Sequence, residues 1–117
     1  MQSFFSQVRI RQLAGFLSLV YMGGLYWLSD QPGVHAIPPF PGADKVVHFV
    51  LYFGLGVLLH MGIQKVRITG SIGITYGIFD EVHQFFVPGR SCDPLDMLAD
   101  GFGVLGGLWI TQRILRG

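Results

Sequence analysis

The sequence predicts an all-α membrane protein, namely a four-helix transmembrane bundle with both termini in the cytoplasm. Half of its 117 residues are hydrophobic and only 13% are charged, a composition too apolar for a typical soluble domain. Four apolar segments are each close to the roughly 20 residues that cross a hydrocarbon core of about 30 Å. The basic residues are also concentrated on one side of the predicted bundle. Together these observations predict one transmembrane domain over residues 1–117.

The predicted helices cover approximately residues 13–29, 44–63, 68–87 and 95–115. The first ends before a linker that begins at Pro32 and Gly33 and is rich in both residue types, which cannot sustain a helix. A polar stretch at residues 64–67 separates the second helix from the third. The third ends at Pro88 and Gly89, and the fourth begins just after Pro94, a residue favoured in the first helical turn.

The first apolar segment has some features of a signal peptide, because Arg9 and Arg11 precede a short apolar run. No cleavage site of the Ala-x-Ala type follows Trp27, so we expect this segment to be retained as a helix. Cys92 is the single cysteine in the chain and therefore predicts no internal disulfide.

The distribution of charge predicts the orientation. Four crossings place both termini and the loop between the second and third helices on the same side. Six of the eight Lys and Arg residues are on that side, so the positive-inside rule makes it the cytoplasmic face of the membrane. Those six are Arg9, Arg11, Lys65, Arg67, Arg113 and Arg116. The seven acidic residues are all toward the outer side: Asp30, Asp44, Asp80, Glu81, Asp93, Asp96 and Asp100.

Polar residues form a stripe on each of the last three predicted helices. At 100° per residue, each stripe spans an arc of roughly 100° or less and therefore shares one helix face. Charged groups at this depth are costly if they face lipid, so we expect the stripes to face the bundle interior. The stripes are Asp44, His48 and Tyr52; Tyr76, Asp80, His83 and Gln84, with Glu81 at the edge; and Asp96 with Asp100.

Glycines continue two of these faces. Gly103 and Gly107 follow the Asp100 face at GxxxG spacing, and Gly73 and Gly77 lie on the Asp80 face. Small residues at this spacing let two helix backbones approach closely. We expect tight helix packing beneath the polar site, and the same faces could also support a homo-oligomer.

Three segments resemble the signature blocks of VanZ-like membrane proteins: DKVVHFVLY at residues 44–52, DEVHQFFVPGRS at 80–91 and DPLDMLADG at 93–101. The last acidic position of that pattern is often Asn, so Asp100 departs from it mildly. The family takes its name from a protein that gives low-level resistance to the glycopeptide teicoplanin. The resemblance therefore implies a role in the bacterial cell envelope, although nothing in this chain is specific to antibiotic resistance.

Asp80, Glu81 and His83 place two carboxylates and an imidazole within one helical turn, a candidate acid/base group. The alternative is a network of hydrogen bonds and ion pairs that holds the helices together. Asp93 is expected to cap the fourth helix, and Asp44 has a similar alternative on the second. The candidate binding residues are Asp44, Lys45, His48, Tyr52, Gln84, Arg90, Asp96 and Asp100.

The sequence predicts no metal site, because it lacks HExxH-type spacing and Cys/His ligand pairs, and it predicts no cofactor. No nucleic-acid partner is expected either, since the basic residues act as topology determinants. Membrane lipids are the expected surroundings.

Three functions remain open. The first is an outward-facing site that binds or processes an envelope molecule, such as a lipid-linked head group or a glycopeptide. The second is a proton- or cation-coupled transporter or binding protein. The third is a non-catalytic structural partner of another membrane protein. The residues leave open whether the protein is an enzyme.

Overall fold

The computed structural model describes residues 4–30, 42–89 and 93–116. Within these ranges the chain forms four helices and no strand: α1 Phe4–Ser29, α2 Ala43–Ile63, α3 Val66–Phe85 and α4 Pro94–Arg116. The predicted all-helical fold is confirmed, and α2, α3 and α4 begin and end within about two residues of their predicted bounds. Most of the predicted linker lies outside the described residues, as does Cys92.

α1 begins at Phe4, so the predicted start near residue 13 was wrong. The polar first part of this helix is stabilised by contact with the end of α2. Arg11 donates hydrogen bonds to the carbonyl oxygens of Gly62, at 3.1 Å, and Ile63, at 3.2 Å. The last carbonyls of a helix have no partner within it, and the negative end of its dipole favours a cation. A tertiary contact therefore supports a helical segment that hydropathy did not predict.

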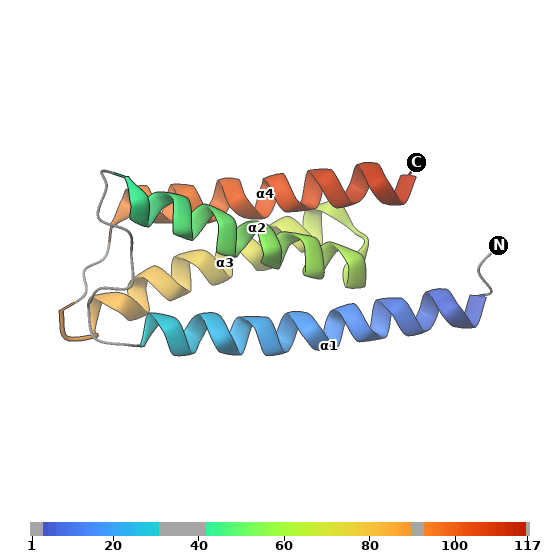
Figure 1. Cartoon of the computed structure of the whole chain (residues 1–117), viewed down its shortest axis with the longest axis horizontal. Coiled ribbons are helices and arrows are strands. Elements are labelled where there is room, and N and C mark those ends of the chain that lie inside the picture. Colours follow the sequence, from blue (N-terminus) through green and yellow to red (C-terminus); the bar gives the residue numbers. More distant parts are fainter. Residues whose placement is uncertain (1–3, 31–41, 90–92, 117) are drawn as a thin grey trace.

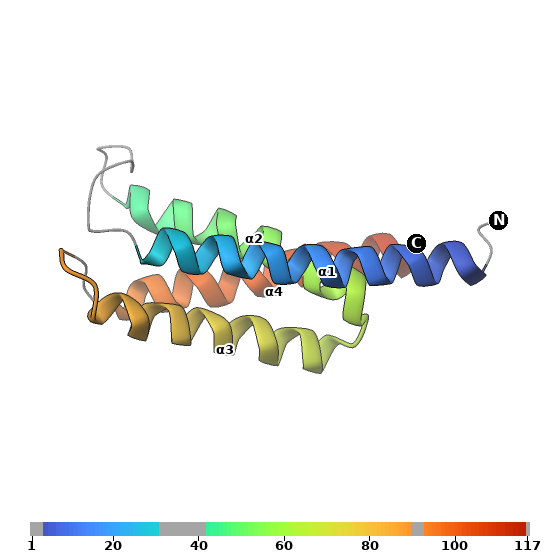
Figure 2. The same ribbon diagram turned by 90° about the horizontal axis from the view of Figure 1, so that it is seen from below.

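The four helices form an elongated bundle, 50 Å along its longest axis. α1 and α3 run in one direction and α2 and α4 in the other (Figure 1). The start of α1, the turn between α2 and α3, and the end of α4 therefore lie at the same end of the molecule. In the perpendicular view, α2 and α3 lie on opposite sides of α1 (Figure 2). All seven acidic residues belong to the helix ends opposite the chain termini.

α2 and α4 are parallel and form the closest helix pair. A Cβ atom at Gly103 or Gly107 would collide with the carbonyl oxygen of Phe49 or Phe53 on α2. Gly56 of α2 faces the backbone of α4 in the same way. The predicted close packing at the Gly103 and Gly107 face is confirmed, because only glycine allows this approach. Since α2 of the same chain covers this face, a homo-oligomer would need another surface.

Apolar side chains lie both in the interior of the bundle and on its surface. An apolar core around Leu55 and Val104, both 0% exposed, lies between two groups of buried polar residues. Large apolar side chains are exposed on all four helices, including Leu19, Val50, Phe79, Phe85, Phe102 and Ile114. Among the described helices, only α2 is long and apolar enough to cross a membrane by length and composition alone.

Candidate functional site

Lys45 lies among three aspartates near the starts of α2 and α4. Its ammonium lies 2.6 Å from Asp44, 2.7 Å from Asp93 and 3.1 Å from Asp96. Asp93 also accepts a hydrogen bond from the backbone N–H of Leu95 at 2.9 Å, which confirms the predicted cap of α4. The hydrogen bond from Lys45 lowers the pKa of the Asp93 carboxyl below its ordinary value. Asp44 does not cap α2; its side chain pairs with Lys45.

His48 lies one turn deeper and joins α2 to α4. Its Nδ1 atom is 2.8 Å from Oδ1 of Asp100, and its Nε2 atom is 3.6 Å from Oδ2 of Asp96. The histidine side chain is 13% exposed and that of Asp100 is 1% exposed. The carboxylate therefore fixes the orientation of the imidazole ring. This pairing depends on the register of α2 against α4.

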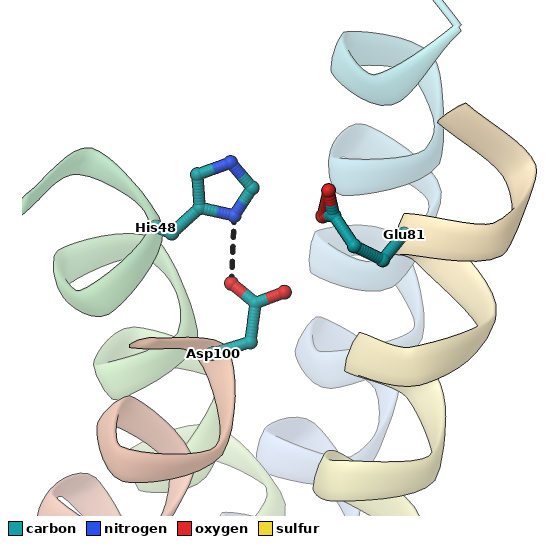
Figure 3. A group of neighbouring side chains, drawn as sticks. All are labelled: His48, Glu81 and Asp100. Atoms are coloured by element: carbon teal, nitrogen blue, oxygen red, sulfur yellow. Dashed lines mark hydrogen bonds and ion pairs between the residues drawn. The ribbon is translucent and has the colours of Figure 1, made fainter. Parts of the chain in front are cut away.

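Glu81 of a third helix, α3, lies close to His48 and Asp100. It is fully buried on α3, and its Oε1 atom accepts a hydrogen bond from the backbone N–H of Asp93 at 3.3 Å. Figure 3 shows the Glu81 carboxylate facing His48 and Asp100 from the opposite side. We call His48, Glu81 and Asp100 the His48 cluster. Its members come from α2, α3 and α4.

Asp80 lies beside the His48 cluster and is 3% exposed. Its Oδ2 atom accepts a hydrogen bond from the hydroxyl of Tyr52 at 2.7 Å, across the interface of α2 and α3. Its other oxygen, Oδ1, has no hydrogen-bond partner, and the same is true of Oδ2 of Asp100. Two buried carboxylate oxygens with unused acceptor capacity therefore lie at this end of the bundle.

The predicted acid/base group is divided between two faces of α3. Asp80, Glu81 and the buried Gln84 point inward, whereas His83 packs toward α1. Its Nε2 atom is 3.0 Å from Asp30, and its ring stacks on Tyr26 with a centroid separation of 4.5 Å. The histidine that faces Glu81 is His48, whereas His83 is paired with Asp30 at the end of α1. Residues close together in the sequence can therefore point to different neighbouring helices when they lie on different sides of α3.

A second buried histidine was given no role by the sequence analysis. His60 is 1% exposed, and its ring nitrogens lie 3.0 Å from the hydroxyl of Thr69 and 2.7 Å from Oε1 of Gln112. We call these three residues the His60 cluster. They lie close together only because α2, α3 and α4 converge there, and no sequence spacing indicates it. Arg90, a predicted binding residue, lies outside the described residues.

A protein-family model described as VanZ/LLP1 matches residues 2–116 of this sequence. The chain belongs to the VanZ/LLP1 family. Neither the curated proteins nor the solved structures gave a significant match. The family match also covers α1, whereas the resemblance noted in the sequence covered only segments between residues 44 and 101.

Among the described residues of this VanZ/LLP1 protein, two groups of side chains bring possible metal ligands within 4.8 Å of one another. One is the His48 cluster, and the other is Asp44, Asp93 and Asp96, around Lys45. The sequence analysis predicted no metal site because it considered only ligands close in the sequence. In the His48 cluster the three donors come from three different helices, so no short ligand motif in the sequence indicates them.

Proposed function

We propose that this VanZ/LLP1 protein is a single multi-pass domain of the bacterial cytoplasmic membrane, crossed by all four helices and with both termini in the cytoplasm. Its outer end carries an intramembrane polar site that binds the head group of a cell-envelope molecule, such as a lipid-linked sugar or a glycopeptide-like compound. The observation that carries the proposal is the burial of the His48 cluster, from three helices, at one end of a bundle whose outer surface is apolar.

The exposed apolar surface supports the membrane assignment. Monomeric soluble proteins rarely expose such continuous apolar surface. α3 and α4 have an acidic composition at one end, which lowers their hydropathy, yet Asp80, Glu81, Asp96 and Asp100 are all buried. Lipid would therefore meet mainly apolar side chains on these helices, as the cost of exposing charge to hydrocarbon requires. The 20 residues of α3, the shortest helix, span about 30 Å.

The arrangement of the helix ends supports the orientation. The six basic residues predicted to be cytoplasmic belong to the start of α1, the turn between α2 and α3, and the end of α4, which lie at one end (Figure 1). Arg113 also stacks over the ring of Trp109 at 5.3 Å, a pairing suited to a membrane interface. The His48 cluster then faces the outer surface.

Unused hydrogen-bonding capacity favours ligand binding over a purely structural role. Oδ1 of Asp80 and Oδ2 of Asp100 are buried without a partner, which is costly unless something else satisfies them. If the bound molecule is also processed, His48 is a better candidate acid or base than His83, because Asp100 orients the His48 ring. The family resemblance to a glycopeptide-resistance protein supports an envelope ligand.

The apolar core disfavours a continuous transport path. Leu55, Leu59, Val104 and Leu108, all buried, lie between the His48 and His60 clusters along α2 and α4. A proton relay needs polar groups within hydrogen-bonding reach of one another. The twelve residues from His48 to His60 correspond to about 18 Å along the helix axis. Binding at the outer end therefore fits the described residues better than transport through them.

The proposal is tested by measuring which lipids the purified full-length protein retains. Native mass spectrometry in detergent would compare a polyprenyl phosphate, a polyprenyl diphosphate-linked sugar and phosphatidylglycerol. We expect one polyprenyl ligand to bind, and His48→Gln to weaken it about tenfold or more, since a hydrogen bond to a charged group contributes about 1.5 to 3 kcal/mol. His60→Gln is the matched control. Equal retention by the wild type and the His48 variant would contradict the proposal.

Orientation has an independent test. Cys92 lies in the sequence between α3 and α4 and should react with a membrane-impermeant maleimide in intact spheroplasts. In a Cys92→Ser background, Gln64→Cys places a thiol at the opposite end of the bundle and should react only after lysis. The reverse pattern would overturn the outward orientation.

A further inference from the structure

The His48 cluster offers one imidazole nitrogen and two carboxylate oxygens that lie within 4.8 Å of one another. The three residues come from α2, α3 and α4 and point toward a common space (Figure 3). Glu81 is 0% exposed and Asp100 is 1% exposed. Burying two carboxylates so close together is unfavourable unless positive charge compensates them.

The two carboxylate oxygens of Asp100 have different surroundings. Oδ1 of Asp100 is bonded to His48, but Oδ2 has no hydrogen-bond partner although the residue is almost completely buried. In Figure 3 this second oxygen points toward the Glu81 side of the cluster. Buried polar atoms in proteins usually have a hydrogen-bond partner or bind an ion or water, so this oxygen is suited to accept a ligand.

The neighbouring group of three aspartates differs because a lysine side chain lies among its carboxylates. Asp44, Asp93 and Asp96 also meet the distance requirement, but the ammonium of Lys45 lies within 3.1 Å of all three. A lysine side chain therefore already supplies the positive charge there. No lysine or arginine among the described residues forms an ion pair with Asp100, whose side-chain partner is the imidazole of His48.

The donor set indicates the chemical class of the cation. Imidazole favours zinc and other transition metals over calcium and magnesium, and carboxylates also accept manganese. Two donors bound to one such ion at about 2.1 Å lie roughly 3 to 4 Å apart, so small rotations of the cluster side chains suffice. Three protein ligands leave a coordination position open.

We propose that His48, Glu81 and Asp100 bind a divalent transition-metal ion, of the zinc or manganese class, whose open position accepts an anionic oxygen. The second part rests on the proposed function, because the anion would be the phosphate of the bound head group. A metal ion removes the main electrostatic difficulty of that function: carboxylates alone repel a phosphate, whereas a bound cation attracts it.

The experiment uses the full chain, purified without a polyhistidine tag and titrated with Zn²⁺, Mn²⁺ and Co²⁺ in detergent. We expect one equivalent of ion per chain. Glu81→Gln and Asp100→Asn should each weaken binding by at least about 100-fold, the upper end of the loss caused by removing even an outer partner of a metal ligand. His60→Gln and Asp93→Asn should bind like the wild type.

A second variant tests the site even if a neutral substitution disturbs folding. In a Cys92→Ser background, His48→Cys replaces the nitrogen ligand by a thiolate, so bound Co²⁺ should acquire a sulfur-to-metal charge-transfer band. Absence of that band in a protein that still binds Co²⁺ would place the ion elsewhere and overturn the proposal. Failure of the wild type to bind any of the three ions would overturn it as well.

The two proposals fail separately. Loss of polyprenyl phosphate binding in His48→Gln, with no metal bound by the wild type, would refute the metal site and leave head-group binding intact. One bound metal that depends on His48 and Asp100, with no lipid retained, would support the metal site and refute head-group binding.

Discussion

Two histidines on α2, the partly exposed His48 and the buried His60, have the same position relative to α4 but different surroundings. His48 contacts Asp100 and His60 contacts Gln112, and both pairs are separated by 52 residues. The match arises because α2 and α4 are parallel and the glycine contacts hold them in one register. The backbone arrangement is therefore alike at both ends of the helix pair, and the chemistry of the partners makes the difference.

At His60 both ring nitrogens have uncharged partners, a hydroxyl and an amide oxygen. At His48 the partners are carboxylates, and Oδ2 of Asp100 has no hydrogen-bond partner. A closed set of neutral hydrogen bonds can stabilise a helix bundle without binding anything. Hydrogen bonds hold both histidines, but of the two clusters only the His48 cluster combines buried carboxylates with a carboxylate oxygen that has no hydrogen-bond partner.

The largest expected effect on stability comes from breaking the register that both histidines share. Gly107→Val places a side chain against the carbonyl oxygen of Phe53 and the backbone nitrogen of Val57, neither of which can move aside easily. We expect the free energy of unfolding to fall by about 3 kcal/mol, the upper part of the usual range for overpacking. Unfolding by SDS, followed by circular dichroism, measures it.

Gly24→Ala is the control for that variant, since a Cβ at Gly24 has no atom within 4 Å. Equal stability of the two variants would show that α2 and α4 do not depend on the glycine contact.

The second largest effect on stability is expected from removing the histidine of the His60 cluster. His60→Leu leaves Thr69 and Gln112 without their histidine partner inside the bundle, and a buried group without a partner costs about 1 to 3 kcal/mol. Metal and lipid binding at the other end should not change. The same unfolding assay and a Co²⁺ titration check the two halves of this prediction, and a loss of Co²⁺ binding would mean that the clusters are coupled.

Asp100→Asn should change stability less than the two preceding variants, although it should strongly weaken metal binding. Asp100→Asn keeps an oxygen that can accept from His48 and replaces the oxygen that has no partner by an amide. Removing a buried charge offsets the weaker interaction with the histidine, so the free energy of unfolding should change by less than about 1 kcal/mol. A decrease above about 3 kcal/mol, typical of a broken buried pair, would indicate a structural role instead.

The smallest effect is expected at the exposed rim around Lys45. Lys45→Met should cost less than about 1 kcal/mol, because the side chains of Lys45, Asp44 and Asp93 are each about a third exposed. The lowered pKa of Asp93 gives the same contribution a pH dependence. It is fully present above the pKa of the unfolded chain, about 4, and is lost as the pH falls through the lower folded value.

Unfolding measured from pH 6 to pH 3 should therefore show a slightly steeper loss of stability for the wild type than for Lys45→Met. Parallel curves would mean that the Lys45 and Asp93 pair contributes nothing in solution.

Much of the fold followed from patterns that act locally along the chain. Prolines, glycines and apolar runs predicted α2, α3 and α4 closely, and Asp93 was recognised as a cap because its role involves only the next two residues. The start of α1 was missed since its support comes from the end of α2, 51 residues away in the chain. Local signals cannot report a contact of that kind.

For the candidate site, the sequence alone predicted which residues are polar and which face of each helix they share, because helical periodicity is a property of one helix. Only the tertiary structure decided which faces meet. It paired His83 with Asp30, and it brought His48 to Glu81 and Asp100. The physical reason is that the rotation and register of neighbouring helices depend on packing across the whole bundle, here on the backbone contacts at Gly103 and Gly107.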